Sequence, residues 1–271
     1  MSTEFFRVAR VPLRALLVFI AALTALPVAL GQQFAAMVSP PRFELEGRPG
    51  QTQRQIIEIT NGDLVASSYR LRTMDWTLDD KGGVRLSEDL AKDSCRPWVA
   101  IERRDILVPA HGKYRFRFEV TPPADAAGEC RFAIAIEGGG ATVDAGQVRI
   151  PVNAQIAVIV YVTMAGAKPE LSVVRTAVVE RNGVKMPAIY VRNAGRAHGR
   201  LEGFLDGTEA GGRKIELTPD GLPILPDETR EIVLNVASEA EPRTPLTFPI
   251  TVRGNLEWSG ISTPFEARFA P

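Results

Sequence analysis

The hydrophobic positions of this chain follow the period of β-strands, and the longest such pattern covers residues 146–162. In its first half Val148, Ile150 and Val152 alternate with polar residues, which places these three side chains on one face of a strand. Residues 156–162 are almost wholly apolar and rich in β-branched side chains, which favours a buried strand over a helix. Pro151 has no N–H group for a ladder and therefore indicates an edge strand. We predict one long edge strand with a hydrophobic stripe, followed by a buried half that leads into a second domain.

Shorter strands separated by turn residues precede this segment. Turn signals lie at Arg48-Pro49-Gly50-Gln51, at Asn61-Gly62 and at residues 79–83 and 109–112. The strands predicted between these turns cover residues 34–46, 55–59, 68–76, 98–108, 114–120 and 132–136. Prolines 40 and 41 place the first of them at a sheet edge. About seven strands without a convincing amphipathic helix are typical of an immunoglobulin-like sandwich.

The same pattern of short strands separated by turn residues returns after a short linker at residues 165–169. Further strands are predicted at residues 171–180, 188–192, 199–205, 214–217, 230–236, 248–252 and 265–269. The fold prediction is therefore all-β, with two tandem immunoglobulin-like β-sandwich domains. The predicted boundaries are 32–164 for the first domain and 165–271 for the second.

The first residues have the pattern of a secretory signal. Three arginines precede an apolar run over residues 15–30, and Ala29-Leu30-Gly31 offers small residues at the cleavage positions. The alternative is an uncleaved anchor, but the run is short for a membrane span of roughly 20 residues and contains Pro27. We expect residues 1–31 to be a cleaved signal peptide.

Charge and cysteine content narrow the function further. Lys plus Arg equals Asp plus Glu at 32 each, so nothing favours nucleic acid or a membrane surface as a partner. The chain has two cysteines, Cys95 and Cys130, and no Cys-x-x-Cys motif. In an exported protein they are expected to form a structural disulfide.

Residues with catalytic chemistry are scarce. The two histidines, His111 and His198, each lie beside a glycine in a turn, where we expect them to be solvated. Neither belongs to a pattern that would form a metal site or a catalytic triad. The glycines at 138–140 are followed by no phosphate-binding signature and indicate a hairpin loop. We predict no catalytic residue, no metal site, no cofactor and no small-molecule substrate, so the protein is not expected to be an enzyme.

Several segments together resemble the periplasmic chaperones of chaperone–usher pilus systems. They are Arg42-Phe43-Glu44-Leu45, Pro49-Gly50-Gln51, Glu58-Ile59-Thr60-Asn61, Tyr69, Pro97-Trp98-Val99, Ile106-Leu107-Val108-Pro109, residues 128–132 and the long alternating strand. The resemblance covers residues 34–271. It implies two immunoglobulin-like domains set at an angle, a periplasmic location, fimbrial or pilus subunits as partners and an outer-membrane usher.

The resemblance also assigns roles to residues. It implies that the strand carrying Val148, Ile150 and Val152 is donated to an incomplete subunit by strand addition, and that these side chains pack in the subunit. In the family an arginine and a lysine anchor the subunit's terminal carboxylate, and Arg42 matches the arginine. The lysine position falls on or near Ala157, where no basic residue occurs, so the chain is a divergent case.

Two alternatives remain open at the level of sequence. The stripe can pack in this protein's own core instead of in a partner. The chain can also be a structural or adhesive protein of the cell envelope, built from two sandwiches.

Overall fold

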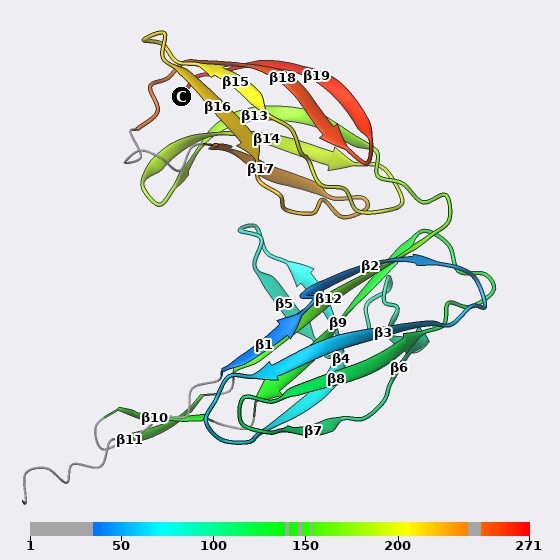
Figure 1. The fold of residues 1–271 in the computed structure, drawn as a ribbon. Coiled ribbons are helices and arrows are strands. Elements are labelled where there is room, and N and C mark those ends of the chain that lie inside the picture. Colours follow the sequence, from blue (N-terminus) through cyan, green and yellow to red (C-terminus); the bar gives the residue numbers. More distant parts are fainter. Residues whose placement is uncertain (1–34, 139–140, 146–147, 153, 238–244) are drawn as a thin grey trace, which may run out of the picture.

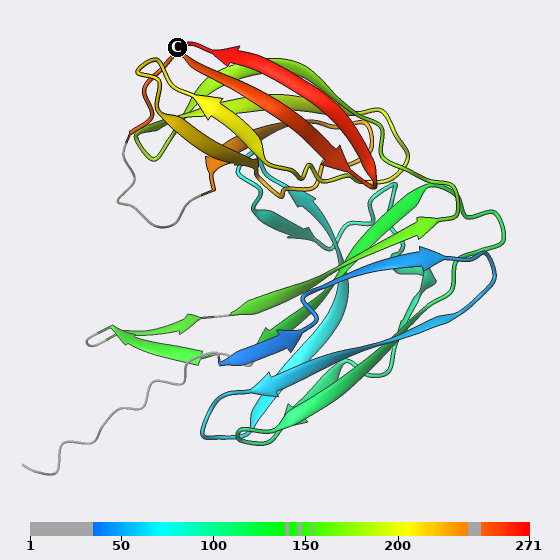
Figure 2. The ribbon, with the colours of Figure 1, turned by 45° about the horizontal axis from the view of Figure 1, so that its top comes forward.

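A computed structural model describes residues 35–138, 141–145, 148–152, 154–237 and 245–271. It contains two β-sandwiches in tandem, which lie at an angle to one another (Figures 1 and 2). The only helical element among these residues is a 3₁₀ turn, η1 (Arg96–Trp98). The expected fold class, two tandem immunoglobulin-like sandwiches, is confirmed.

Twelve strands make up the first sandwich. They are β1 (Ala36–Ser39), β2 (Arg42–Gly47), β3 (Gln53–Asn61), β4 (Ser67–Leu78), β5 (Val84–Ser87), β6 (Val99–Ile101), β7 (Asp105–Val108), β8 (Lys113–Val120), β9 (Glu129–Gly138), β10 (Ala141–Ala145), β11 (Val148–Val152) and β12 (Gln155–Met164). One layer has the order β1-β3-β8-β6. The other has the order β2-β12-β9-β4-β5, with β7 also paired to β4.

The alternation of β8 illustrates how sequence pattern becomes packing. Phe116 and Phe118 are buried in the core between the two layers. Arg115 and Arg117, which alternate with them, are exposed. This period of two places one face of the strand in the core and the other in solvent, as predicted for this segment.

The predicted first strand is divided in the structure. We expected one strand over residues 34–46, but β1 pairs with β3 in one layer and β2 pairs with β12 in the other. The change of layer occurs at the cis Ser39–Pro40 peptide. Pro40 and Pro41 have no N–H groups, so neither residue can donate to a continuous ladder across this point.

The prediction of one long strand over residues 146–162 is also wrong. Its second half is β12, which runs along β9 and β2 and has buried residues at Val158, Val160 and Val162, as expected. Its first half is β11, which pairs with β10, the strand that follows β9. Gln155 pairs with Glu137 in β9–β12, whereas Val152 pairs with Ala141 in β10–β11, so the pairing is shifted by one residue between the two parts.

The two cysteines form the expected disulfide. Cys95 and Cys130 are bonded, with 5.4 Å between their Cα atoms, and Cys95 is fully buried. The bridge joins the residue before η1 to β9 in the core of the first sandwich. Trp98 packs against the same core.

The second sandwich is a folded seven-stranded sheet with the order β13-β14-β17-β16-β15-β18-β19. Its strands are β13 (Leu171–Arg181), β14 (Val184–Asn193), β15 (Leu205–Thr208), β16 (Lys214–Pro219), β17 (Thr229–Val236), β18 (Ile250–Trp258) and β19 (Ile261–Phe269). The strand predicted over residues 199–205 is not formed. Its residues make only isolated bridges, Gly199 to Ile224 and Glu202 to Glu257.

The predicted signal peptide at residues 1–31 lies outside the described residues. Within the described ranges, no helix has the length and apolar character needed to cross a membrane.

Candidate functional site

The β10–β11 hairpin is the part of the first sandwich that extends beyond its two layers (Figure 2). Its register places Ala145 opposite Val148, Val143 opposite Ile150 and Ala141 opposite Val152. Among the described strands, β11 pairs with β10 alone. One edge of β11 therefore has its backbone groups paired, and the other has no strand beside it in the part of the chain that is described.

The predicted stripe residues Val148, Ile150 and Val152 occupy alternate positions of β11. Pro151, which lies between the last two, faces Thr142 in the register with β10. The side chains of this segment lie outside the described residues, so their role stays a prediction.

The region where the two sandwiches meet, called the cleft below, includes the parallel pair of β2 and β12 and is closed by side chains such as Tyr161, which is buried. Arg42 is in register with Ile159, and Glu44 with Tyr161. Arg42 forms an ion pair with Glu44, with 3.0 Å between Nε and Oε1, and both side chains are about half exposed, at 48% and 50%. The predicted anchor residue Arg42 therefore lies at the start of β2, beside Tyr161 of β12.

His198 enters this cleft from the second sandwich. Its ring stacks on Tyr161, with 3.8 Å between the ring centroids. Its Nδ1 lies 2.7 Å from Oε2 of Glu129, and its backbone N–H donates to Oε1 of the same carboxylate at 3.0 Å. The Glu129 side chain is 1% exposed and that of His198 is 10% exposed. Our prediction of a solvated turn histidine is therefore wrong, because the partner of His198 comes from the other domain.

Arg200 is a second cation in the same cleft. Its Nη1 donates to the carbonyl oxygen of Gly221 at 2.6 Å, while its Nε is buried with no hydrogen-bond partner among the described residues. Burial is the main cause that lowers the pKa of the Arg200 guanidinium, and repulsion from Arg42 lowers this pKa further. Burial also raises the pKa of Tyr161 to about 12, so this phenol is neutral at ordinary pH. Arg42 and Arg200, from different domains, thus lie near one another beside a neutral hydroxyl group, and Glu44 already supplies one negative charge to both. Two guanidinium groups exceed this one carboxylate, an arrangement that favours a further carboxylate ligand.

Sequence reasoning missed Arg200, and no signal in its neighbourhood identified it. The tertiary fold alone brings it near Arg42. Ala157 is partly buried against a small cluster that includes Trp76 and Tyr161, and it pairs with Ala135 of β9. β12 therefore has alanine, and no basic side chain, at this position. The second guanidinium group near Arg42 comes from the other sandwich.

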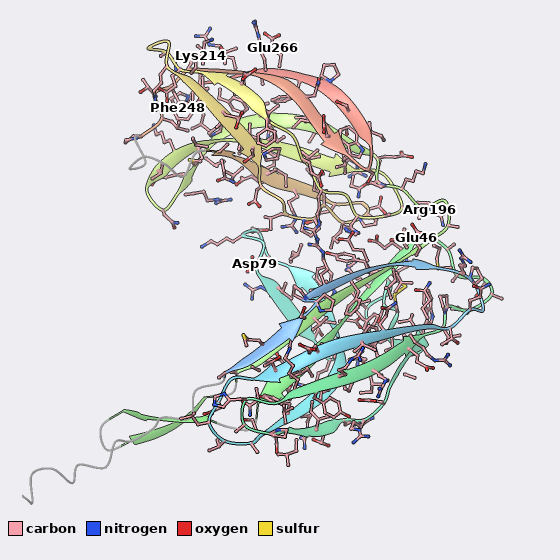
Figure 3. All side chains as sticks on the ribbon, viewed as in Figure 1. Glu46, Asp79, Arg196, Lys214, Phe248 and Glu266 are labelled. Carbon is pink, nitrogen blue, oxygen red and sulfur yellow. A yellow bond between two sulfur atoms is a disulfide. The ribbon has the colours of Figure 1, made fainter. Side chains whose placement is uncertain are left out.

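A second contact between the domains lies at the turn that joins β4 and β5. Arg230 donates through Nη1 to the carbonyl oxygen of Asp79 at 3.0 Å. Figure 3 shows Asp79 at the end of this hairpin, which faces the second sandwich.

Apolar contacts lie beside this hydrogen bond. Gly82, with φ +80°, lies so close to Leu222 that an added Cβ would be 2.4 Å from the leucine side chain. Leu225 packs with Trp76 and Tyr161 in a shared cluster. The two sandwiches are therefore joined by both apolar and polar contacts.

Candidate metal ligands do not converge in the part of the chain that the structure covers. It contains no group of three or more His, Cys, Asp or Glu side chains placed to hold a metal ion. His111 is exposed in the turn before β8, where it has φ 51°.

Comparison with solved structures finds fimbrial chaperones. CfaA, a class 5 fimbriae chaperone, has 12% identity and a TM-score of 0.45 over 87% of this chain and 99% of that chain. The chaperone YadV has 11% identity and a TM-score of 0.45, over 86% of this chain and 99% of that chain. The E. coli chaperone DraB has 12% identity and a TM-score of 0.44, over 88% and 97%.

No family model and no curated protein matches the sequence.

Proposed function

We propose that this protein is a non-enzymatic periplasmic chaperone that binds fimbrial or pilus subunits by donating β11 as an edge strand. The observation that carries the proposal is the pairing of β11, which has β10 on one edge and no described strand on the other. An unpaired edge offers N–H and C=O groups to an incoming strand.

The stripe supplies the apolar part of this interaction. In strand addition the main chain gives affinity, and alternate side chains fill pockets of the partner. Burying Val148, Ile150 and Val152 would contribute roughly 4–8 kcal/mol by area, before the ordering cost of association. An apolar edge strand without a partner invites aggregation, so a strand of this sequence would be expected to be covered by a client.

The cleft supplies a charged anchor. Arg42 and Arg200 would hold the terminal carboxylate of the subunit, with Arg200 in place of the basic residue that β12 lacks at Ala157. The repulsion between the two guanidinium groups and the unpartnered Nε of Arg200 support this assignment. Glu44 already offsets part of this repulsion, and a subunit carboxylate would accept a hydrogen bond from the unpartnered Nε of Arg200.

Export by residues 1–31 would bring the chaperone to the compartment where subunits arrive, and an usher would accept the loaded complex. The domains that carry these roles are 32–164 for strand donation and 165–271 for the second wall of the cleft. The alternative is a structural or adhesive envelope protein, in which β11 pairs with another copy of the chain.

Co-purification tests the proposal. The tagged, exported protein is expressed together with its neighbouring gene products, as wild type and with Val148, Ile150 and Val152 all changed to Thr. Threonine keeps strand propensity and removes most of the hydrophobicity. A matched control changes three exposed valines of the second sandwich, Val173, Val174 and Val184, to Thr.

We expect a small β-rich subunit to accompany the wild type and the control and to be lost from the folded stripe variant. Self-association of the wild type, with no subunit bound, would instead support the envelope-protein alternative. Unfolding of the stripe variant, with no subunit bound to the wild type, would place the stripe in the protein's own core.

A further inference from the structure

The second sandwich carries a hollow of about 720 Å³ near the ends of β16 and β18. Its lining includes Gly221, whose carbonyl oxygen accepts a hydrogen bond from Arg200, so the hollow adjoins the proposed anchor. Its walls come from the segment before β15, from β18 and from the end of β16, and include Glu202, Phe204, Thr218, Asn255 and Glu257. None of these residues takes part in the proposed strand donation. A volume of this size is typical of sites for small ligands or for a few side chains of a partner.

Glycine allows the two sides of the hollow to approach closely. Gly203 has φ +111°, and a Cβ at this position would lie 2.6 Å from the carbonyl oxygen of Asn255. A larger residue at position 203 would therefore push the segment away from β18. The close approach sets Glu202 opposite Glu257, where each backbone N–H donates to the other residue's carbonyl oxygen, at 2.8 and 3.0 Å.

This pairing places two acidic residues opposite one another, and both side chains are exposed. Residues that oppose each other in an antiparallel bridge project to the same face, and like charges in such a pair are destabilising. Neither Glu202 nor Glu257 has a cationic partner among the described residues. Glu257 accepts only one long hydrogen bond, from Ser262 at 3.4 Å. A cation in the hollow would therefore meet two acidic side chains on the same face.

Phe204 shows which kind of cation fits. It is 68% exposed, although the next residue, Leu205, is fully buried. Phe204 lines the same hollow as the two carboxylates and presents an aromatic ring to solvent beside them. A bare metal ion gains little from such a ring, whereas a guanidinium group stacks on an aromatic face and bonds carboxylates in pairs. A neutral sugar would stack on the ring but leave the carboxylates repelling one another.

We propose that this hollow binds an arginine side chain presented by an extended segment of a partner protein. The guanidinium group lies between Glu202 and Glu257, its aliphatic stem and planar face contact Phe204, and Asn255 and Thr218 bond to the backbone of the segment. The second sandwich thus has a recognition site of its own, separate from β11.

A titration with a defined probe tests this site. The probe is the capped tripeptide acetyl-Gly-Arg-Gly-amide, and its matched control has citrulline, which has nearly the same shape and no charge, in place of arginine. Backbone amide shifts of the full exported chain are followed by NMR. We expect saturable shifts around Gly203 and Asn255 with the arginine peptide, and binding about tenfold weaker or worse with the citrulline peptide.

Three variants separate the contributions. The double change Glu202→Gln and Glu257→Gln should weaken arginine-peptide binding at least about tenfold, and Phe204→Leu about threefold. Glu266→Gln is the control, because Glu266 already pairs with Arg253 on the neighbouring strand, at 2.8 Å. That variant should bind the peptide as the wild type does. Without peptide, Glu257→Gln should raise the melting temperature slightly, because it removes the like-charge pair.

Three results would overturn the proposal. One is equal binding of the arginine and citrulline peptides. Another is unchanged binding by the folded glutamine double variant. The third is a stronger response of the same amides to maltotriose or to Ca²⁺ than to the arginine peptide. Because no fimbrial subunit is present, failure here leaves the donated strand unaffected.

Discussion

Nδ1 of His198 lies 2.7 Å from Oε2 of Glu129, and this contact joins the second sandwich to a carboxylate of β9 in the first. The hydroxyl group of Thr163 donates to the same Oε2 at 2.9 Å. The imidazole ring stacks on Tyr161, so the pair is enclosed as well as bonded. A nearly buried carboxylate without these donors would be costly, and the two domains therefore depend on one another here.

The first prediction concerns this contact. His198→Asn should lower the free energy of unfolding by about 1–3 kcal/mol, because it removes the stacked ring and leaves Glu129 short of a donor. Urea unfolding followed by tryptophan fluorescence measures the change, and uncoupled domains would give two transitions in place of one. The matched control is His111→Asn, since His111 is exposed and asparagine tolerates its positive φ. Equal effects of the two substitutions would contradict a structural role for His198.

The second prediction concerns alkaline pH. Burial raises the pKa of Tyr161 to about 12, whereas in the unfolded chain a tyrosine ionises near pH 10. The unfolded chain therefore releases this proton first, so stability is lost as pH rises from about 10 to about 12. The loss attributable to Tyr161 should reach roughly 2–3 kcal/mol. Tyr161→Phe should have a flatter fall in unfolding free energy above about pH 10 than the wild type. Parallel curves for the two proteins would show that Tyr161 ionises as freely in the folded state as in the unfolded one.

The third prediction concerns the disulfide. Cys95 and Cys130 are 35 residues apart in sequence, and closing a loop of this length stabilises a fold by about 3–4 kcal/mol on the chain-entropy model. Changing both cysteines to alanine should lower the denaturant midpoint of the first sandwich accordingly. If the second sandwich unfolds in a separate transition, that transition should keep its midpoint. A variant as stable as the oxidised wild type would show that the bridge adds nothing to the fold.

The fourth prediction concerns the two arginines of the cleft and rests on the proposed function. Arg42→Ala and Arg200→Ala should each weaken binding of a fimbrial subunit about 10- to 100-fold, the usual effect of removing a charge-assisted hydrogen bond. Titration calorimetry with the purified subunit measures this. Arg54→Ala is a suitable control, because Arg54 is an exposed arginine paired with Glu119 on the outer face of the first sandwich. If only Arg42→Ala weakened subunit binding, Arg200 would have no part in the anchor. The proposal of strand donation by β11 would be unaffected.

The sequence by itself determined the class of fold, because strand periodicity and turn residues are local properties. Alternation in residues 114–120 predicted the buried and exposed faces of β8, and the count and context of the cysteines predicted their bond. The apolar half of the long pattern predicted a buried strand, and β12 is that strand. In each case the pattern required only that one face of a segment leaves water.

Tertiary structure decided the rest, because it sets which segments meet. Whether residues 146–162 pair without interruption depends on the neighbouring hairpin arm, and a one-residue shift in pairing between β9–β12 and β10–β11 divides them. His198 is enclosed because Glu129 and Tyr161, both distant in sequence, lie opposite it. Arg200 faces Arg42, and Glu202 faces Glu257, only after the two sandwiches and the segment before β15 have folded. Such contacts join residues far apart along the chain, and local pattern carries no information about them.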